Sequence, residues 1–235
     1  IVLVDVDKDK AHAQALDIAD SVSFCERETV VRDGDYKDCE DAALVVVAIG
    51  EARKPGQTRL DMLGRSVEML KELLEQLKPY KIPGIVVTIT NPADIVADYV
   101  RKGLGLERNR VFGTGTLLDT ARLIRTLSEE SGVGRRSIQA YSLGEHGDSS
   151  MIPFSAVGGL PFDAYDISKE KVLEATRQIG MTIIEGKKST EFGIGRALTE
   201  IAACILRDEK KIMPASVLLQ GEYGQHDVHC GVPCL

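Results

Sequence analysis

The sequence lacks any apolar run long enough to cross a membrane, which would need roughly 18–20 consecutive apolar residues. Its longest run, residues 42–49, is better explained as a buried strand. Positive charge is not in excess either, because the net charge is -7 and the two signs are interleaved, so nucleic acid is not an expected partner. With 235 residues and 43% hydrophobic composition, we expect a soluble globular chain of one large domain or two small ones.

Cysteine is scarce and odd in number, with five residues at positions 25, 39, 204, 230 and 234. The run His226, His229, Cys230 and Cys234 suggests zinc, but it lacks the paired spacing of structural zinc sites. We therefore predict no metal site, and interpret the cysteines as reduced thiols of a cytoplasmic protein.

Short apolar strands alternate with helical patterns in the first half of the chain, which predicts a doubly wound parallel sheet of the Rossmann type. Strands are expected at residues 1–6, 29–31, 44–49 and 85–90, with the third buried on both faces, and helices at residues 8–21 and 60–77. The later pattern predicts helices at Leu117–Ser131 and at residues 169–185 and 193–206, and a strand at 215–219. We place a domain boundary near residue 114, between a nucleotide-binding domain (1–114) and an α+β catalytic domain (115–235).

Three residues fall at the ends of predicted strands: Asp5, Gly50 and Asn91. In doubly wound sheets, ligands bind at the carboxyl ends of the strands. These residues are therefore expected to line one edge of the sheet.

The stretch Ser142-Leu143-Gly144-Glu145-His146-Gly147-Asp148-Ser149 contains one of only four histidines, set among glycines. An earlier block contains Asp119 and Arg122, three residues apart, which puts both on one face of a helix. An imidazole, an orienting carboxylate and a guanidinium can move a proton on a small anionic acid. The alternatives are a structural histidine and a surface ion pair.

Five blocks in this order resemble the L-lactate/malate dehydrogenase family: Leu3-Val4-Asp5, Lys54-Pro55-Gly56-Gln57-Thr58-Arg59, Thr90-Asn91-Pro92-Ala93-Asp94, the block with Asp119 and Arg122, and the block with His146. The resemblance implies NAD-dependent interconversion of an L-2-hydroxy acid and its 2-oxo acid. His146 would be the acid–base group, Asp119 its orienting carboxylate and Arg122 the group that binds the substrate carboxylate. A non-catalytic relative that kept the fold is a remote alternative.

The resemblance also implies roles for residues outside this group. Asp5 would bind the adenosine ribose and select NAD over NADP, or it could cap the next helix, as Asp7 could. Asn91 would contact the substrate oxygen beside the nicotinamide, unless it belongs to a plain Asn-Pro turn. Arg59 would polarise the substrate carbonyl from a closing loop. Thr190 would line the substrate pocket or cap a helix.

The substrate is the point at which the motifs disagree. By the resemblance, Arg53 occupies the position that faces the side group of the substrate, and an arginine there is typical of malate dehydrogenases. Gln57 departs from the acidic residue common in lactate dehydrogenases, so the loop does not by itself decide the substrate. The stretch Gly113–Asp119, the Asn91 block and Thr190 resemble the lactate branch. We expect L-lactate and pyruvate, with malate as the alternative.

Further expectations follow from the same resemblance. A homodimer or homotetramer is expected. Activation by fructose 1,6-bisphosphate is not, because Ile124 and Gln139 stand where phosphate-binding groups would be, although Arg125 is nearby. Relatives are expected to have a first strand and a glycine-rich turn before Ile1, and a further strand and helix after Leu235. They are also expected to have a longer connection between Phe162 and Ser168. We therefore interpret the sequence as an incomplete record.

Overall fold

The computed structural model describes residues 1–50, 59–156, 162 and 166–235. Its helices are α1 (Lys8–Val22), α2 (Arg59–Leu77), α3 (Ala93–Leu104), α4 (Leu117–Ser131), α5 (Lys169–Lys187) and α6 (Phe192–Arg207). Its strands are β1 (Val2–Leu3), β2 (Arg32–Asp33), β3 (Leu44–Val47), β4 (Ile85–Thr88), β5 (Val111–Gly113), β6 (Met213–Gln220) and β7 (His226–Cys234). No helix in these described ranges is long and apolar enough to cross a membrane.

The strands form two sheets. β1 and β2 pair in parallel as a two-stranded sheet, and the other five strands follow the order β3-β4-β5-β6-β7. Pairing is parallel from β3 to β5 and antiparallel from β5 to β7. The parallel strands, each separated from the next by a helix, confirm the predicted doubly wound α/β fold.

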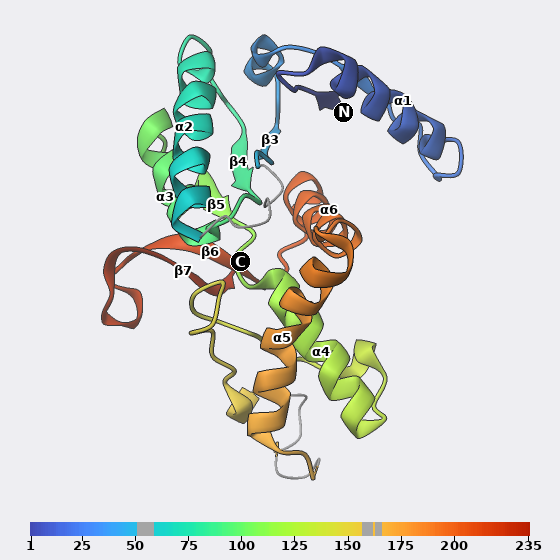
Figure 1. Ribbon diagram of the computed structural model, residues 1–235, viewed down its shortest axis with the longest axis vertical. Helices are drawn as coiled ribbons and strands as arrows, with labels where there is room; N and C mark the ends of the chain where they lie inside the picture. Colours follow the sequence, from blue (N-terminus) through green and yellow to red (C-terminus); the bar gives the residue numbers. More distant parts are fainter. Residues whose placement is uncertain (51–58, 157–161, 163–165) are drawn as a thin grey trace.

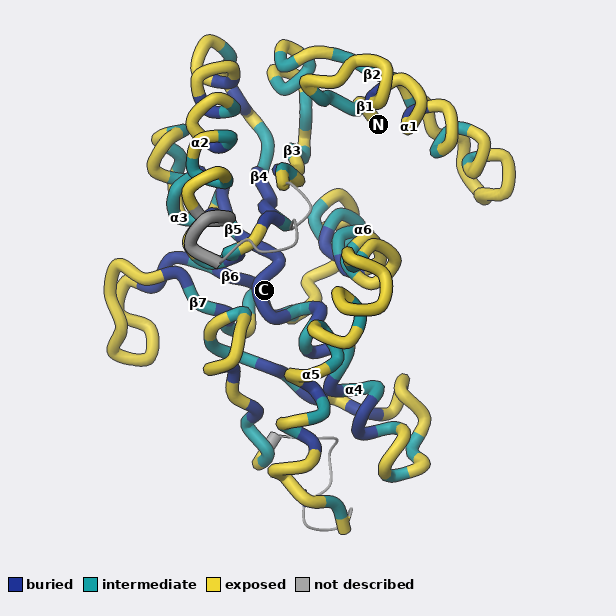
Figure 2. The backbone as a smooth tube through the Cα atoms, viewed as in Figure 1, coloured by how far each residue is buried: buried dark blue, intermediate teal, exposed yellow. Residues whose placement is uncertain are grey.

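Two buried clusters hold the elements together. One joins β3, β4 and β5 to α2 and α3 through Val47, Leu70, Leu77, Ile82, Val86, Val96, Val100 and Val111. The other joins α4 and α5 to the segments around them through Leu123, Leu127, Ile138, Ala140, Ile152, Phe162 and Val172. In Figure 1, α2 and α3 lie side by side along β4 and β5, α4, α5 and α6 lie together in another part of the molecule, and α1 stands apart at the upper right. Figure 2 shows that burial follows the same two centres, with α1 largely exposed.

Several helices begin and end where the residue types allow. α4 places Leu118, Leu123 and Leu127 on its buried face, and it ends at Gly132, whose φ of 73° suits glycine. The side chain of Ser168 caps α5 by accepting a hydrogen bond from the Lys171 N–H at 3.2 Å. The prediction for α4 is confirmed at both ends, and those for α2, α5 and α6 are confirmed within two residues.

Two strand predictions were wrong in detail. Residues 29–31 lie outside any strand, because the partner of Val2 in β1 is Arg32, and Val30 is 79% exposed. β3 is not buried on both faces: it is an edge strand of the five-stranded sheet, with Val47 buried and Val46 37% exposed. Three elements were missed: α3, although Ala93, Val96, Ala97 and Val100 have helical spacing, the three-residue strand β5, and β7, whose Gly231 and Pro233 lower strand propensity.

Leu123 tests the importance of the second cluster. It is fully buried on the helix that carries Asp119 and Arg122. Leu123→Ala should lower the free energy of unfolding by about 2–5 kcal/mol, because the cavity is not refilled. Leu206→Ala, at a 61% exposed position of α6, should change it by less than about 0.5 kcal/mol. Urea unfolding followed by circular dichroism measures both, and equal losses would show that the cluster is not what stabilises α4.

Candidate active site

Asp119 and Arg122 lie one turn apart at the start of α4. The Arg122 Nη1 donates to Asp119 Oδ1 at 2.8 Å, so the expected common face is confirmed. Both side chains are largely buried, with 12% and 13% of their surfaces exposed for Arg122 and Asp119. The carboxylate is thus placed at a helix N-terminus, where negative charge is stabilised.

His146 lies in the loop between Leu143 and Met151, which pair with each other through their backbones. The residue after Leu143, Gly144, also pairs with Gly231 of β7. Gly144 has a φ of 91°, a conformation that favours glycine. This loop brings the Nδ1 of His146 to 2.6 Å from Asp119 Oδ2, so each Asp119 oxygen has its own partner.

The shared carboxylate sets the protonation of the pair. Burial raises the pKa of Asp119, but the hydrogen bond from His146 and the charges of His146 and Arg122 outweigh it, so the pKa lies below its ordinary value. The hydrogen bond to Asp119 raises the pKa of His146 above 6.5, against burial and the Arg122 charge. The imidazole is therefore suited to hold a proton near neutral pH and to release it to a substrate.

A pocket of about 190 Å³ opens beside this pair. This is below the roughly 300–1,000 Å³ of pockets for drug-sized ligands, which fits a small acid. The described residues that line it are Asp119, Arg122, His146, Gly147, Asp148, Ser150, Thr176, Arg177 and Met181.

Arg122 does not use all of its donors on Asp119. Its Nε is buried and has no hydrogen-bond partner among the described residues. Gly180 of α5 faces the guanidinium, and a Cβ at that position would lie 3.1 Å from Nη1. The glycine thus leaves room for the guanidinium beside α5, and Arg122 brings a positive charge to the lining of the pocket, which favours an anionic ligand.

Gly50 and Asn91 meet at the same edge of the sheet. Thr90 Oγ1 donates to the carbonyl of Ile49 at 2.7 Å, which ties together the segments after β3 and β4. Gly50 and Asn91 directly follow these two residues, and both are exposed. Gly50 and Asn91 thus lie at one sheet edge as expected, although neither lines the pocket beside His146. The expectation that Asp5 shares this edge was wrong, because Asp5 follows β1 of the separate two-stranded sheet.

Asp5 follows β1 and is separate from that pocket. Its Oδ1 accepts a hydrogen bond from the Asp7 N–H at 3.1 Å, and its Oδ2 lies 3.0 Å from Lys10 Nζ. The Asp7 N–H in particular lowers the pKa of Asp5, against a smaller effect of burial, with Lys10 also lowering it. The N-cap of α1 is Asp7, so the alternative that Asp5 caps this helix is wrong.

The remaining predicted residues are less closely tied to the pocket. Thr190 precedes α6, whose N-cap is Glu191, so Thr190 is not the cap. It does not line the pocket, and its Oγ1 lies near Gly193. Arg53 lies outside the described residues, and so does the side chain of Arg59, whose backbone begins α2.

The cysteine and histidine run does not gather in space. His226 is exposed at the start of β7, whereas the side chain of His229 is 1% exposed and lies 3.4 Å from Asp98 of α3. No group of three or more metal-binding side chains occurs in the part of the chain that the structure describes. All five cysteines are free thiols.

Two residues near His146 were given no role from the sequence. Asp94 Oδ2 accepts a hydrogen bond from the His146 backbone N–H at 3.0 Å. Arg177 Nη2 of α5 donates to the Ser150 carbonyl at the end of the same loop. The Asp94 motif was visible beside Asn91, but no sequence signal marks Arg177.

Comparison with known proteins agrees with this geometry. The family model of the lactate/malate dehydrogenase NAD binding domain matches residues 1–113, and that of the lactate/malate dehydrogenase alpha/beta C-terminal domain matches residues 116–235. L-lactate dehydrogenase 3 of Bacillus cereus is 39% identical over 246 aligned residues, which cover 100% of this chain and 78% of that protein.

Two solved structures match over 100% of this chain and 78% of theirs. MGS-M5, a lactate dehydrogenase from a Medee basin deep-sea metagenome library, has a TM-score of 0.92 at 38% identity. The malate dehydrogenase of Aeropyrum pernix has a TM-score of 0.91 at 32% identity. The chain belongs to the lactate/malate dehydrogenase family.

Proposed function

We propose that the protein is an NAD-dependent dehydrogenase that interconverts L-lactate and pyruvate. The observation that carries this proposal is the geometry of Asp119, which lies 2.6 Å from the imidazole of His146 and 2.8 Å from the guanidinium of Arg122. The pair supplies a positioned acid–base group beside an anion-binding group, and the similarity to L-lactate dehydrogenases supports the substrate.

The described residues fit NAD at the carboxyl ends of the parallel strands. The carboxylate of Asp5 would accept hydrogen bonds from the adenosine ribose hydroxyls and repel a 2'-phosphate, which favours NAD over NADP. A Cβ added to Gly50 would meet nothing within 4 Å, so its backbone is open to a ligand. Asn91 would act near the nicotinamide. When bound, NAD accepts or supplies the hydride at the substrate carbon.

His146 moves the proton that accompanies the hydride. In lactate oxidation, the neutral imidazole takes the hydroxyl proton of the substrate as the carbon loses its hydride. In pyruvate reduction, the imidazolium returns that proton to the carbonyl oxygen. Asp119 fixes the tautomer, because its bond to Nδ1 leaves Nε2 as the nitrogen that exchanges a proton with the substrate.

Arg122 holds the carboxylate of the substrate. A guanidinium binds a carboxylate through two parallel hydrogen bonds, and this fixes the position of the neighbouring carbon. The place of Arg122 in the lining of the pocket beside His146 supports this role. Arg59 would polarise the carbonyl, and Asn91 and Thr190 would complete the substrate site.

The two-domain division at residue 114 and the assembly are also part of the proposal. Separate buried clusters on the two sides of that position support the division.

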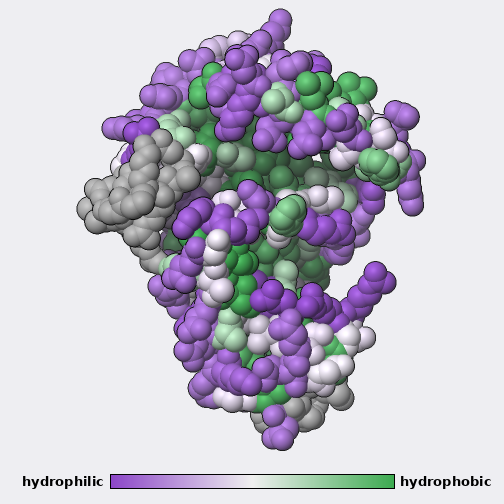
Figure 3. Space-filling view, turned by 45° about the vertical axis from the view of Figure 1, so that its right-hand side comes forward, coloured by the Kyte–Doolittle hydropathy of each residue, from purple (hydrophilic) through white to green (hydrophobic). Residues whose placement is uncertain are grey.

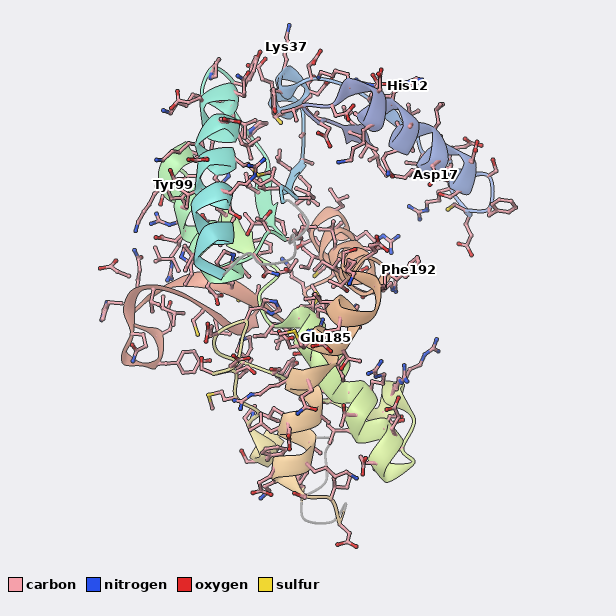
Figure 4. The ribbon with its side chains drawn as sticks, viewed as in Figure 1. His12, Asp17, Lys37, Tyr99, Glu185 and Phe192 are labelled. Carbon is pink, nitrogen blue, oxygen red and sulfur yellow. The ribbon has the colours of Figure 1, made fainter. Side chains whose placement is uncertain are left out.

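A homodimer or homotetramer is supported by exposed apolar side chains on α5 and at the start of α6. These are Met181, Ile184 and the outward-pointing Phe192 (Figure 4). Free thiols support a cytoplasmic location.

Malate remains the second candidate because of Arg53. An arginine facing the substrate side group would pair with the second carboxylate of a dicarboxylate, and an unpaired guanidinium in a closed pocket would be costly.

Fructose 1,6-bisphosphate activation is not expected, since Ile124 packs against the buried cluster around Leu123 and carries no charge.

The pH dependence of pyruvate reduction should follow His146. Because the step needs imidazolium, the rate should persist at pH values above 6.5 and fall as pH passes through the raised pKa. Asp119→Asn lowers the pKa of His146, so the falling limb should move to lower pH, and kcat should drop by about 10–100-fold as the ring loses its orientation. Steady-state rates between pH 5 and 9 measure both effects.

Asp17→Asn provides the matched control, since it removes the same charge from α1, far from the pocket (Figure 4). It should keep the wild-type profile. A falling limb that stays in place in Asp119→Asn would contradict the assignment of His146 as the proton donor.

Arg53 distinguishes lactate from malate dehydrogenase. With NADH, the wild-type protein should show a higher kcat/KM for pyruvate than for oxaloacetate, and Arg53→Gln should change this ratio by less than about tenfold, or 1.4 kcal/mol. Lys54→Gln removes a neighbouring cation as control. A preference for oxaloacetate that is lost only in Arg53→Gln would replace the lactate assignment with malate.

A further inference from the structure

The His146 loop is held at its centre by a carboxylate from another part of the chain. Asp94, in the first turn of α3, uses both of its oxygens. Oδ2 accepts from the His146 backbone N–H at 3.0 Å, and Oδ1 accepts from the hydroxyl of Ser216 on β6 at 2.5 Å. Ser216 is fully buried, so this second contact fixes the carboxylate from a rigid strand.

His146 is therefore held at two points by two carboxylates. Asp119 binds its ring, and Asp94 binds its backbone. The two acids lie on different helices, α3 and α4, which fall in the segments matched by the two different domain models. Asp94 thus connects the part of the chain that matches the NAD-binding domain to the backbone of the acid–base residue.

We propose that Asp94 is a positioning residue: together with Ser216, it fixes the His146 backbone so that the imidazole keeps its alignment with Asp119 and with the cofactor side of the site. This inference rests on the proposed role of His146 as proton donor and acceptor. Its physical reason is that a shift of about 1 Å in a catalytic group can cost about 100-fold in rate.

The charge of Asp94 adds a smaller effect on the imidazole. The charged groups around His146 are Asp119 and Arg122 on α4, Asp94 on α3, Arg177 on α5, and Glu145 and Asp148 on its own loop. The pKa of His146 is raised chiefly by the hydrogen bond that its ring donates to Asp119, and Asp94 adds to the rise as the smallest of the contributions. Removing the Asp94 charge should therefore move the pH profile in the same direction as Asp119→Asn, but less.

Three variants separate geometry from charge. Asp94→Ala removes both contacts, Asp94→Asn keeps an acceptor for the His146 N–H but removes the charge, and Ser216→Ala removes only the support of the carboxylate. The control is Asp98→Asn, one turn further along α3, where the acid faces His229 instead of the His146 loop. All are compared with wild type for kcat, KM and the pH profile of pyruvate reduction, with circular dichroism to check folding.

The expected results form an ordered series. Asp94→Ala should lower kcat by about 10–100-fold with a smaller change in KM, and Ser216→Ala should lower it less. Asp94→Asn should keep most of kcat while its falling pH limb moves to lower pH. Asp98→Asn should resemble the wild type. If Asp94→Ala does not fold, Asp94→Asn and Ser216→Ala still test the two effects.

The inference would be overturned if folded Asp94 and Ser216 variants had the same kcat and pH profile as Asp98→Asn. It would also be overturned if they lost stability with an unchanged pH profile and kcat.

Failure of the proposed function is a separate result. The imidazole of His146 can be titrated by NMR in wild type and Asp94→Asn without any turnover. A lower pKa in the variant supports the charge effect even in a protein that reduces no 2-oxo acid, and an unchanged pKa contradicts it.

Discussion

The carboxylate of Asp119 satisfies two cationic groups at once, and the arrangement of the site depends on it. A buried carboxylate with one partner removed would leave an uncompensated charge, which costs about 3–5 kcal/mol in buried pairs. Here the imidazole of His146 and the guanidinium of Arg122 share it. One oxygen of this carboxylate fixes the tautomer of the histidine and the other restrains the arginine, so proton transfer and anion binding are aligned by one group.

The fold explains how this carboxylate reaches its position. Asp119 sits in the first turn of α4, and Leu123 anchors that helix in the second buried cluster. The His146 loop is closed by backbone pairing of Leu143 with Met151 and of Gly144 with Gly231 of β7, and it brings the imidazole to the Asp119 carboxylate. In Figure 3, hydrophilic side chains cover most of the visible face, while hydrophobic ones gather toward its middle.

Local spacing made part of this predictable from the sequence. Asp119 and Arg122 are one helical turn apart, and the periodic leucines and Gly132 define α4, so both the helix and its polar pair could be foreseen. The contact between Asp94 and His146 joins residues 52 positions apart, and that between Asp94 and Ser216 joins residues 122 apart. No spacing rule reaches so far, because such contacts depend on how the sheet and the β6–β7 hairpin pack. β7 was missed for the related reason that its glycine and proline are tolerated only through pairing with β6.

The most direct test of this account is a double-mutant cycle on Asp119→Asn and His146→Gln, measured as kcat/KM for pyruvate reduction. His146→Gln alone should cost roughly 10²–10⁴-fold. Because Asp119 acts through the imidazole, the double variant should lose little more than His146→Gln alone, and the coupling should be about 1–3 kcal/mol. Losses that simply multiply would show that the two residues act independently and would contradict the account.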